Sequence, residues 1–274
     1  MLKNLIKYEW KAVWKALLII NAFTVAVTFL GMIAMHSLSY NGGFHTDDHI
    51  VMTILLFLFY YATIMGVSFA MTIYIAVRFY RNLYTEEGYL MHTLPVTKRQ
   101  LVISKLLVHF VCMCITGILV CASVCLLLLP LMARITEDPS VSVFYLIKEL
   151  TKSGTEAYGL LLPAVFILYV LASIIGQLSG ILSVYCAVSL GQTFQKHKVM
   201  GSILCYVGIY FLLQTITTFA MTPQLVLSIR NTTQFDLAAY LNGTLLTVSI
   251  ISLFTGIAFY IITLHMMEKR LNLD

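Results

Sequence analysis

Charged residues are scarce in this chain. Lys, Arg, Asp and Glu together make up 11% of its 274 residues, whereas soluble globular domains average about 25%. Hydrophobic residues reach 60%, and the mean hydropathy is +0.91. A soluble domain of this length has too small an interior to hide that much apolar surface. The composition therefore excludes a soluble globular protein, an intrinsically disordered chain and a nucleic-acid-binding protein.

Motifs that would carry catalysis or nucleotide binding are also missing. The chain contains no GxxxxGK[ST] phosphate loop and no HExxH zinc motif. Its 6 cysteines lie inside apolar stretches rather than in loops, which predicts small buried side chains instead of disulfides or a zinc site. We therefore expect no enzyme activity, no cofactor and no metal in this chain itself.

Six long apolar runs account for most of the chain. A bilayer core of about 30 Å needs about 20 apolar residues in a helix. Runs of at least that length cover residues 16–38, 50–77, 101–129, 158–190, 200–221 and 241–267. They predict an all-α polytopic membrane protein in which residues 1–274 form a single transmembrane domain with six spans.

The cationic residues are distributed unequally between the predicted loops. If both termini lie inside, 13 of the 17 Lys and Arg residues fall on the inner side. The outer residues are then Arg134, Lys148, Lys152 and Arg230. Because inner loops of membrane proteins carry an excess of positive charge, the sequence predicts that both termini are cytosolic.

The first 15 residues combine lysines with two tryptophans. The lysines recur at every fourth position, and the tryptophans border the apolar face of a helix. Such a helix lies in the membrane plane with its rings at the level of the headgroups. The predicted interface residues are Lys3, Lys7, Trp10, Lys11, Trp14 and Lys15. We expect an amphipathic elbow helix over 1–15; a basic flank that only sets the orientation is the alternative.

A charged segment at 78–107 connects the second and third runs. Gly88 interrupts it, and Thr93-Leu94-Pro95 predicts a rigid turn. Thr97, followed three residues later by glutamine, predicts a helix N-terminus. Lys105 is expected to extend its amine back to the headgroups. A stiff cytosolic protrusion of this kind suits the transmission of force from a soluble partner; an ordinary polar loop is the alternative.

The string GYLMHTLPVT at 88–97, followed by Ser104-Lys105, resembles the cytosolic loop of type-2 ABC exporter permeases of Gram-positive bacteria. In that family the loop forms a coupling helix that docks on the ATPase subunit. The elbow, the six spans and the short loop at 191–198 also look like that family. The resemblance implies that the ATPase-coupling residues are Glu86, Glu87, Gly88, Tyr89, Leu90, Thr93, Leu94 and Pro95.

The resemblance also implies partners and a location. Two soluble ATPase subunits would bind ATP and Mg²⁺, and a second permease copy or a related permease would complete the transporter. The complex would export a peptide-like, drug-like or lipidic cargo, an antimicrobial peptide among them, across the bacterial cytoplasmic membrane. Membrane lipids are the other implied partner, and nucleic acid is not.

Polar residues inside the apolar runs are candidates for a transport path. Carried over from the family, these candidates are Tyr60, Tyr74, Tyr210 and Gln214. Packing between helices or contact with lipid is their alternative role. His109 is the clearest ionisable residue well inside a run, and we expect it to be a hydrogen-bonded packing residue rather than a proton relay.

The sequence leaves three other classes of function as alternatives. No Asp or Glu lies deep in a predicted span, and ion-coupled carriers generally depend on such groups. A secondary transporter that works without an ATPase is therefore the weaker alternative, and a membrane scaffold or sensor subunit is another. A membrane protease is disfavoured, because the paired glutamates at 86–87 lie in the predicted cytosolic loop.

Overall fold

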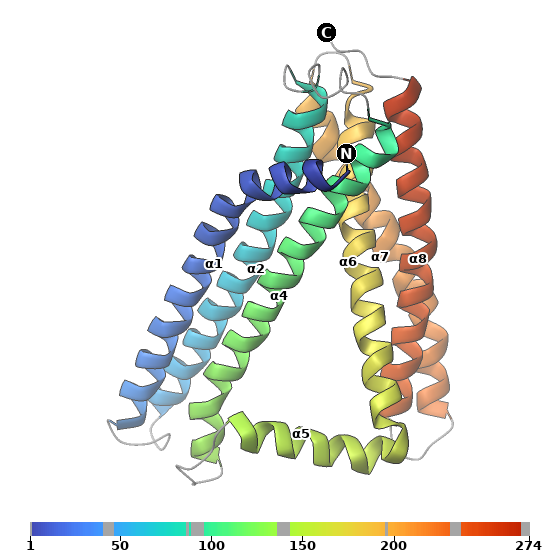
Figure 1. Ribbon diagram of the computed structural model, residues 1–274. Helices are drawn as coiled ribbons and strands as arrows, with labels where there is room; N and C mark the ends of the chain where they lie inside the picture. The colour runs from blue at the N-terminus through green and yellow to red at the C-terminus, as the bar shows by residue number, and fades with distance from the viewer. Residues whose placement is uncertain are drawn as a thin grey trace. The chain divides into compact units, whose positions relative to one another are not determined.

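The structure, a computed structural model, describes residues 2–40, 47–85, 88, 96–135, 143–194, 197–230 and 237–269. Helices account for nearly all of these residues, and no strand occurs among them (Figure 1). The prediction of an all-α protein is therefore confirmed.

Six helices are long and apolar enough to cross a membrane. They are α1 (Leu2–Tyr40), α2 (Asp47–Tyr84), α4 (Lys98–Ile135), α6 (Leu162–Gly191), α7 (Lys198–Arg230) and α8 (Leu237–Lys269). Their candidate spans comprise 29 to 32 residues, about 45 Å at 1.5 Å per residue, which exceeds a bilayer core of about 30 Å. The six spans are confirmed as helices, and their excess length implies tilt or protrusion. The orientation of the chain stays a prediction.

Along the chain, a shorter amphipathic helix lies between the first three long helices and the last three. It is α5 (Val143–Tyr158), followed by a 3-10 turn at Gly159–Leu161. Pro163 stands in the first turn of α6, where its missing N–H costs nothing because the first N–H groups of a helix have no acceptor within it. The fourth span therefore begins at Leu162, next to this proline, rather than at residue 158.

Two helices run further than the sequence pattern predicts. α1 is one helix from Leu2 to Tyr40, so the residues of the predicted elbow and of the first span share it. α7 continues through Pro223, where the pattern had placed the start of a loop. Proline leaves the carbonyl four residues earlier without an N–H donor. Here the Thr222 hydroxyl donates to that carbonyl, of Phe219, at 2.7 Å, which explains why the helix tolerates the proline.

The chain divides into two compact units. Unit 1 comprises Met1–Glu9, Tyr74–Phe110 and Leu160–Asp274, and unit 2 comprises Trp10–Ile73 and Val111–Gly159. The helices α1, α2 and α4 therefore each contribute one part to unit 1 and another part to unit 2.

In unit 1, the second half of α6 is the most buried segment. Nearly every residue from Ser179 to Gly191 is buried. α6 packs against both α7 and α8, which also contact each other. A Cβ atom at Gly191 would lie 2.5 Å from Cα of Ser202 on α7, so the close approach of these helices requires glycine. The hydroxyls of Ser179 and Thr255, 3.3 Å apart, join α6 to α8.

In unit 2, polar side chains are buried between α1, α2 and α4. The buried face of α1 in this unit consists of Val13, Leu17, Asn21, Thr24 and Thr28, which recur every three or four positions. The Thr28 hydroxyl donates to the Thr24 carbonyl at 2.7 Å, so it needs no other partner. The hydroxyls of Tyr60 on α2 and Ser123 on α4 lie 2.5 Å apart and join these helices.

Candidate functional site

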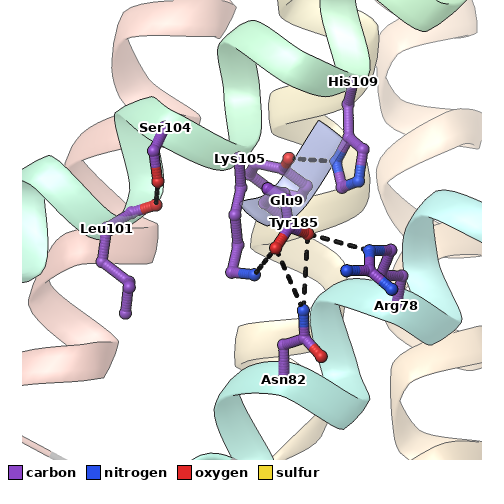
Figure 2. Close-up of polar contacts among 8 residues, drawn as sticks. All are labelled: Glu9, Arg78, Asn82, Leu101, Ser104, Lys105, His109 and Tyr185. Carbon is purple, nitrogen blue, oxygen red and sulfur yellow. Dashed lines mark hydrogen bonds and ion pairs between the residues drawn. The ribbon is translucent and has the colours of Figure 1, made fainter. Parts of the chain in front are cut away.

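A buried cluster of charged side chains joins three helices of unit 1. The carboxylate of Glu9, on α1, accepts a hydrogen bond from Nε of Arg78 at 2.8 Å. Nζ of Lys105, on α4, lies 3.2 Å from the other carboxylate oxygen. The Asn82 amide, one turn after Arg78 on α2, lies 3.4 Å from each oxygen. Figure 2 shows these side chains converging on Glu9.

The local sequence explains how these side chains meet. Arg78 and Asn82 are four residues apart and therefore lie on the same face of α2. Lys105 comes two turns after the start of α4 at Lys98, where an apolar face would otherwise continue. The side chains of Lys105 and Glu9 are only 2% and 7% exposed. Ions so buried are stable only when they are paired.

The burial of Lys105 corrects a sequence-based expectation. Its amine was predicted to reach the headgroups, but it points to Glu9 instead. The physical reason is the carboxylate, which gives the ammonium group an ionic partner inside the protein. Within the cluster one carboxylate faces two cations, so Glu9 neutralises only part of the positive charge around it.

An aromatic layer lies next to the ion cluster. His109 is one turn after Lys105 on α4 and is fully buried. Its Nδ1 lies 2.5 Å from the hydroxyl of Tyr185 on α6, as Figure 2 shows. The Tyr185 ring stacks on Phe79 of α2, with ring centroids 3.9 Å apart. The hydrogen bond expected for His109 is therefore present, while its Nε2 has no partner among the described residues.

The ends of α2 and α4 are held by further polar contacts in unit 1. At the end of α2, the Tyr84 hydroxyl donates to Oγ of Ser189 on α6 at 2.9 Å. At the start of α4, Nζ of Lys98 donates to the carbonyl of Met267 on α8 at 2.7 Å. These two helix ends stand on either side of the predicted coupling segment. These contacts fasten both helix ends to α6 and α8 within unit 1.

The predicted start of α4 is observed with weak capping. Oγ1 of Thr97 accepts a hydrogen bond from the N–H of Gln100 at 3.4 Å. The Thr97 carbonyl accepts the N–H of Leu101 at 3.2 Å. These contacts are those of a helix N-cap.

Of the predicted coupling residues, only Gly88 belongs to the described part of the chain. It is buried, and its N–H donates to the carbonyl of Thr85 at 2.7 Å. A Cβ atom there would lie 2.5 Å from the carbonyl oxygen of Leu83, so a larger residue would disturb the end of α2. The other predicted coupling residues, Glu86, Glu87, Tyr89, Leu90, Thr93, Leu94 and Pro95, lie outside the described residues.

The predicted interface residues fall on an exposed face of α1. Lys3, Lys7, Lys11, Trp14 and Lys15 are exposed, and Trp10 is half-buried. The rings of Trp10 and Trp14 have centroids 5.7 Å apart. Their location at the membrane surface stays a prediction. Glu9, the single acid in this basic stretch, is the centre of the ion cluster, and the sequence pattern did not single it out.

The four predicted path residues belong to both units, and their role in a path stays a prediction. Tyr60 belongs to unit 2, where it is buried against Ser123. Tyr74, Tyr210 and Gln214 belong to unit 1. Tyr210 and Gln214, one turn apart on α7, are exposed, and Tyr74 is half-buried. For Tyr60 the observed contact is the packing role that was its alternative.

No match to this chain was found among protein-family models, curated proteins or solved structures.

Proposed function

We propose that this chain is the transmembrane subunit of an ATP-driven exporter in the bacterial cytoplasmic membrane. The observation that carries the proposal is the fastening of α2 and α4 on either side of the segment 86–97. Glu9 contacts both helices, and Tyr84 and Lys98 tie their ends to α6 and α8. A segment that receives force from a soluble partner needs such stiff supports.

The mechanism follows from these supports. Closure of ATPase subunits on the cytosolic side pushes the segment around Glu86–Pro95. Because α2 and α4 are continuous helices of 38 residues each, a displacement at their cytosolic ends is carried along their length. The contacts of Tyr84 and Lys98 pass part of it to α6 and α8. The resulting rearrangement opens a path outward for a peptide-like, drug-like or lipidic cargo.

The proposal includes partners. Two separate ATPase subunits bind ATP and Mg²⁺, because this sequence has no phosphate loop. A second copy of the chain, or a related permease, completes the transporter. Both termini lie in the cytosol in this arrangement, as the distribution of Lys and Arg predicts.

An ion-coupled carrier is the second candidate function. Its support is that Glu9 and His109 are ionisable and buried in helices long enough to span a membrane. Such groups mark proton or ion pathways in many membrane proteins. This alternative predicts transport that follows the proton or sodium gradient and needs no ATPase.

Co-purification from native membranes separates the two functions. The tagged chain is extracted in mild detergent, and its partners are identified by mass spectrometry and assayed for ATP hydrolysis. A variant with Glu86→Ala, Glu87→Ala and Leu94→Ala removes the predicted contact. A variant with Lys148→Ala and Lys152→Ala, on exposed positions of α5, is the matched control.

The exporter proposal expects a stoichiometric protein with a phosphate loop and ATPase activity. This protein should be lost from the first variant and retained by the control. A folded chain that purifies alone at full yield would refute the exporter proposal. Gradient-driven uptake by that chain, abolished by His109→Phe, would then support the ion-coupled carrier.

A further inference from the structure

The carboxylate of Glu9 is the only group in the cluster that contacts all of its cations. Arg78 and Lys105 each approach one oxygen of Glu9, while the Asn82 amide approaches both. Removal of Arg78 would leave α2 in contact with the carboxylate through Asn82. Removal of Lys105 would remove the contact of its side chain, on α4, with the carboxylate. Removal of the Glu9 carboxylate removes the contacts of the N-terminal segment with both helices at once.

The cluster occupies a special place along the chain. Each of its three helices passes out of unit 1 close to it: α1 after Glu9, α2 before Tyr74 and α4 after Phe110. Arg78 is four residues from its boundary and Lys105 is five residues from its own. The cluster therefore joins the parts of α1, α2 and α4 that belong to unit 1.

From these contacts we infer that Glu9 is a positioning residue for the proposed coupling. It holds the N-terminal segment, the end of α2 and the start of α4 as one body, so that a push on the segment between α2 and α4 moves all three together. This inference rests on the proposed function. Glu9 touches neither nucleotide nor cargo; it acts through the helices that it joins.

The burial of the charges gives this tether its stiffness. Separating Glu9 from Lys105 would break an ionic contact in surroundings from which water is nearly excluded, since their side chains are 7% and 2% exposed. Breaking a contact between buried ions is strongly unfavourable. Displacement of one helix alone is therefore resisted, and displacement of the three helices together is not.

The N-terminal segment thereby gains a role beyond anchoring in the membrane surface. The exposed lysines on either side of Glu9 face outward, while Glu9 faces the helices. The face of the segment that carries the lysines suits contact with lipid headgroups. The opposite face holds α2 and α4 through Glu9. Movement of α2 and α4 is then resisted or guided by the membrane surface itself.

The role of Glu9 is tested with the full-length chain in lipid nanodiscs together with its co-purified ATPase. The variants are Glu9→Gln and Lys105→Met. The matched control is Glu268→Gln, the same chemical change at an exposed acid of α8. Lys105→Met leaves Glu9 and Arg78 as a balanced pair while α4 loses its tether, so it remains informative if Glu9→Gln does not fold.

Two readouts are combined. Acetic anhydride modifies accessible amines, and mass spectrometry compares Lys105 with the exposed Lys3 and Lys7 of the same chain. The second readout is the alkylation rate of Cys121 and Cys125, exposed thiols further along α4, with and without ATP. ATP hydrolysis is measured on the same samples, so that loss of movement is separated from loss of the ATPase.

We expect Lys105 to be protected from acetic anhydride in the parent and in Glu268→Gln. In Glu9→Gln we expect it to be modified like Lys3. We expect ATP to change the alkylation rate of Cys121 and Cys125 in the parent. Glu9→Gln and Lys105→Met should hydrolyse ATP at the parental rate and lose that change. A merely structural role would lower hydrolysis, yield and thiol response together.

Four results would overturn the inference. If both variants keep the ATP-dependent change in alkylation, Glu9 does not couple the helices, although the proposed function stands. The same holds if Lys105 in the parent is modified as fast as Lys3, or if ATP leaves the parental thiols unchanged while hydrolysis proceeds. If no ATPase accompanies the parent, the inference falls together with the proposed function.

Discussion

The charge balance around Glu9 leads to a prediction in which two neutralising substitutions differ in their effect on stability. Glu9→Gln removes the carboxylate that both Arg78 and Lys105 contact and leaves the two cations without that negative charge. Breaking a buried ion pair by removing one partner typically costs about 3–5 kcal/mol. Lys105 is 2% exposed in its side chain and Arg78 is 19% exposed, so the cost comes chiefly from the lysine. We therefore expect destabilisation near the lower end, about 3 kcal/mol.

Lys105→Met acts on the same contact with the opposite charge balance. It removes the surplus cation, keeps an unbranched side chain of similar length, and leaves Glu9 paired with Arg78. Replacing a buried ionic group by a well-packed apolar one is often neutral or stabilising by about 1–4 kcal/mol. We expect a change within about 1 kcal/mol of the parent, because the pair that remains is complete.

Unfolding in mixed micelles with increasing SDS measures both variants. Trp10 and Trp14 follow Glu9 in the same helix and report the transition by fluorescence. A difference of about 3 kcal/mol corresponds to more than a hundredfold in the unfolding equilibrium. The reasoning is wrong if Glu9→Gln unfolds within about 1 kcal/mol of the parent, or if Lys105→Met is the more destabilised of the two.

Two further predictions concern the packing of each unit. Gly191→Ala should destabilise unit 1 by about 1–3 kcal/mol, because its Cβ would lie 2.5 Å from Cα of Ser202. Gly208→Ala, with nothing within 4 Å of its Cβ, should leave the thermal midpoint unchanged or raise it, and equal midpoints for both variants would contradict the close approach. Tyr60→Phe should cost about 0.6 kcal/mol and no more than about 1.7 kcal/mol, since Ser123 keeps its bond to a backbone carbonyl. Thermal unfolding in detergent measures it, and a larger loss would show that Tyr60 does more than join two helices.

The course of α7 shows where sequence reasoning about the fold reached its limit. Hydropathy alone predicted six helical spans, because any backbone group left unpaired in a bilayer is costly. The end of the fifth helix was placed before Pro223, as proline usually requires. The helix continues because the hydroxyl of Thr222 replaces the missing donor. That substitution depends on a side-chain conformation, which no count of apolar residues reveals.

Lys105 shows the same limit for the candidate site. The sequence pattern of a lysine near the end of an apolar run is compatible with two roles. Its amine can reach the headgroups, or it can form a buried ion pair. Only the position of Glu9 decides between them, and Glu9 is separated from Arg78 by 69 residues in the sequence. One acid among several lysines was a weak signal for a pair that forms between distant segments.

The sequence by itself determined that this is a helical protein with six segments able to cross a membrane. It did so because membrane length and backbone hydrogen bonding leave few other solutions for such an apolar chain. The tertiary structure alone decided which polar groups meet inside unit 1. Burial of Glu9, Lys105 and His109 is tolerated only where a partner from another helix stands within bonding distance. Periodicity places a residue on a face of its own helix, but the partner is chosen by how the helices pack.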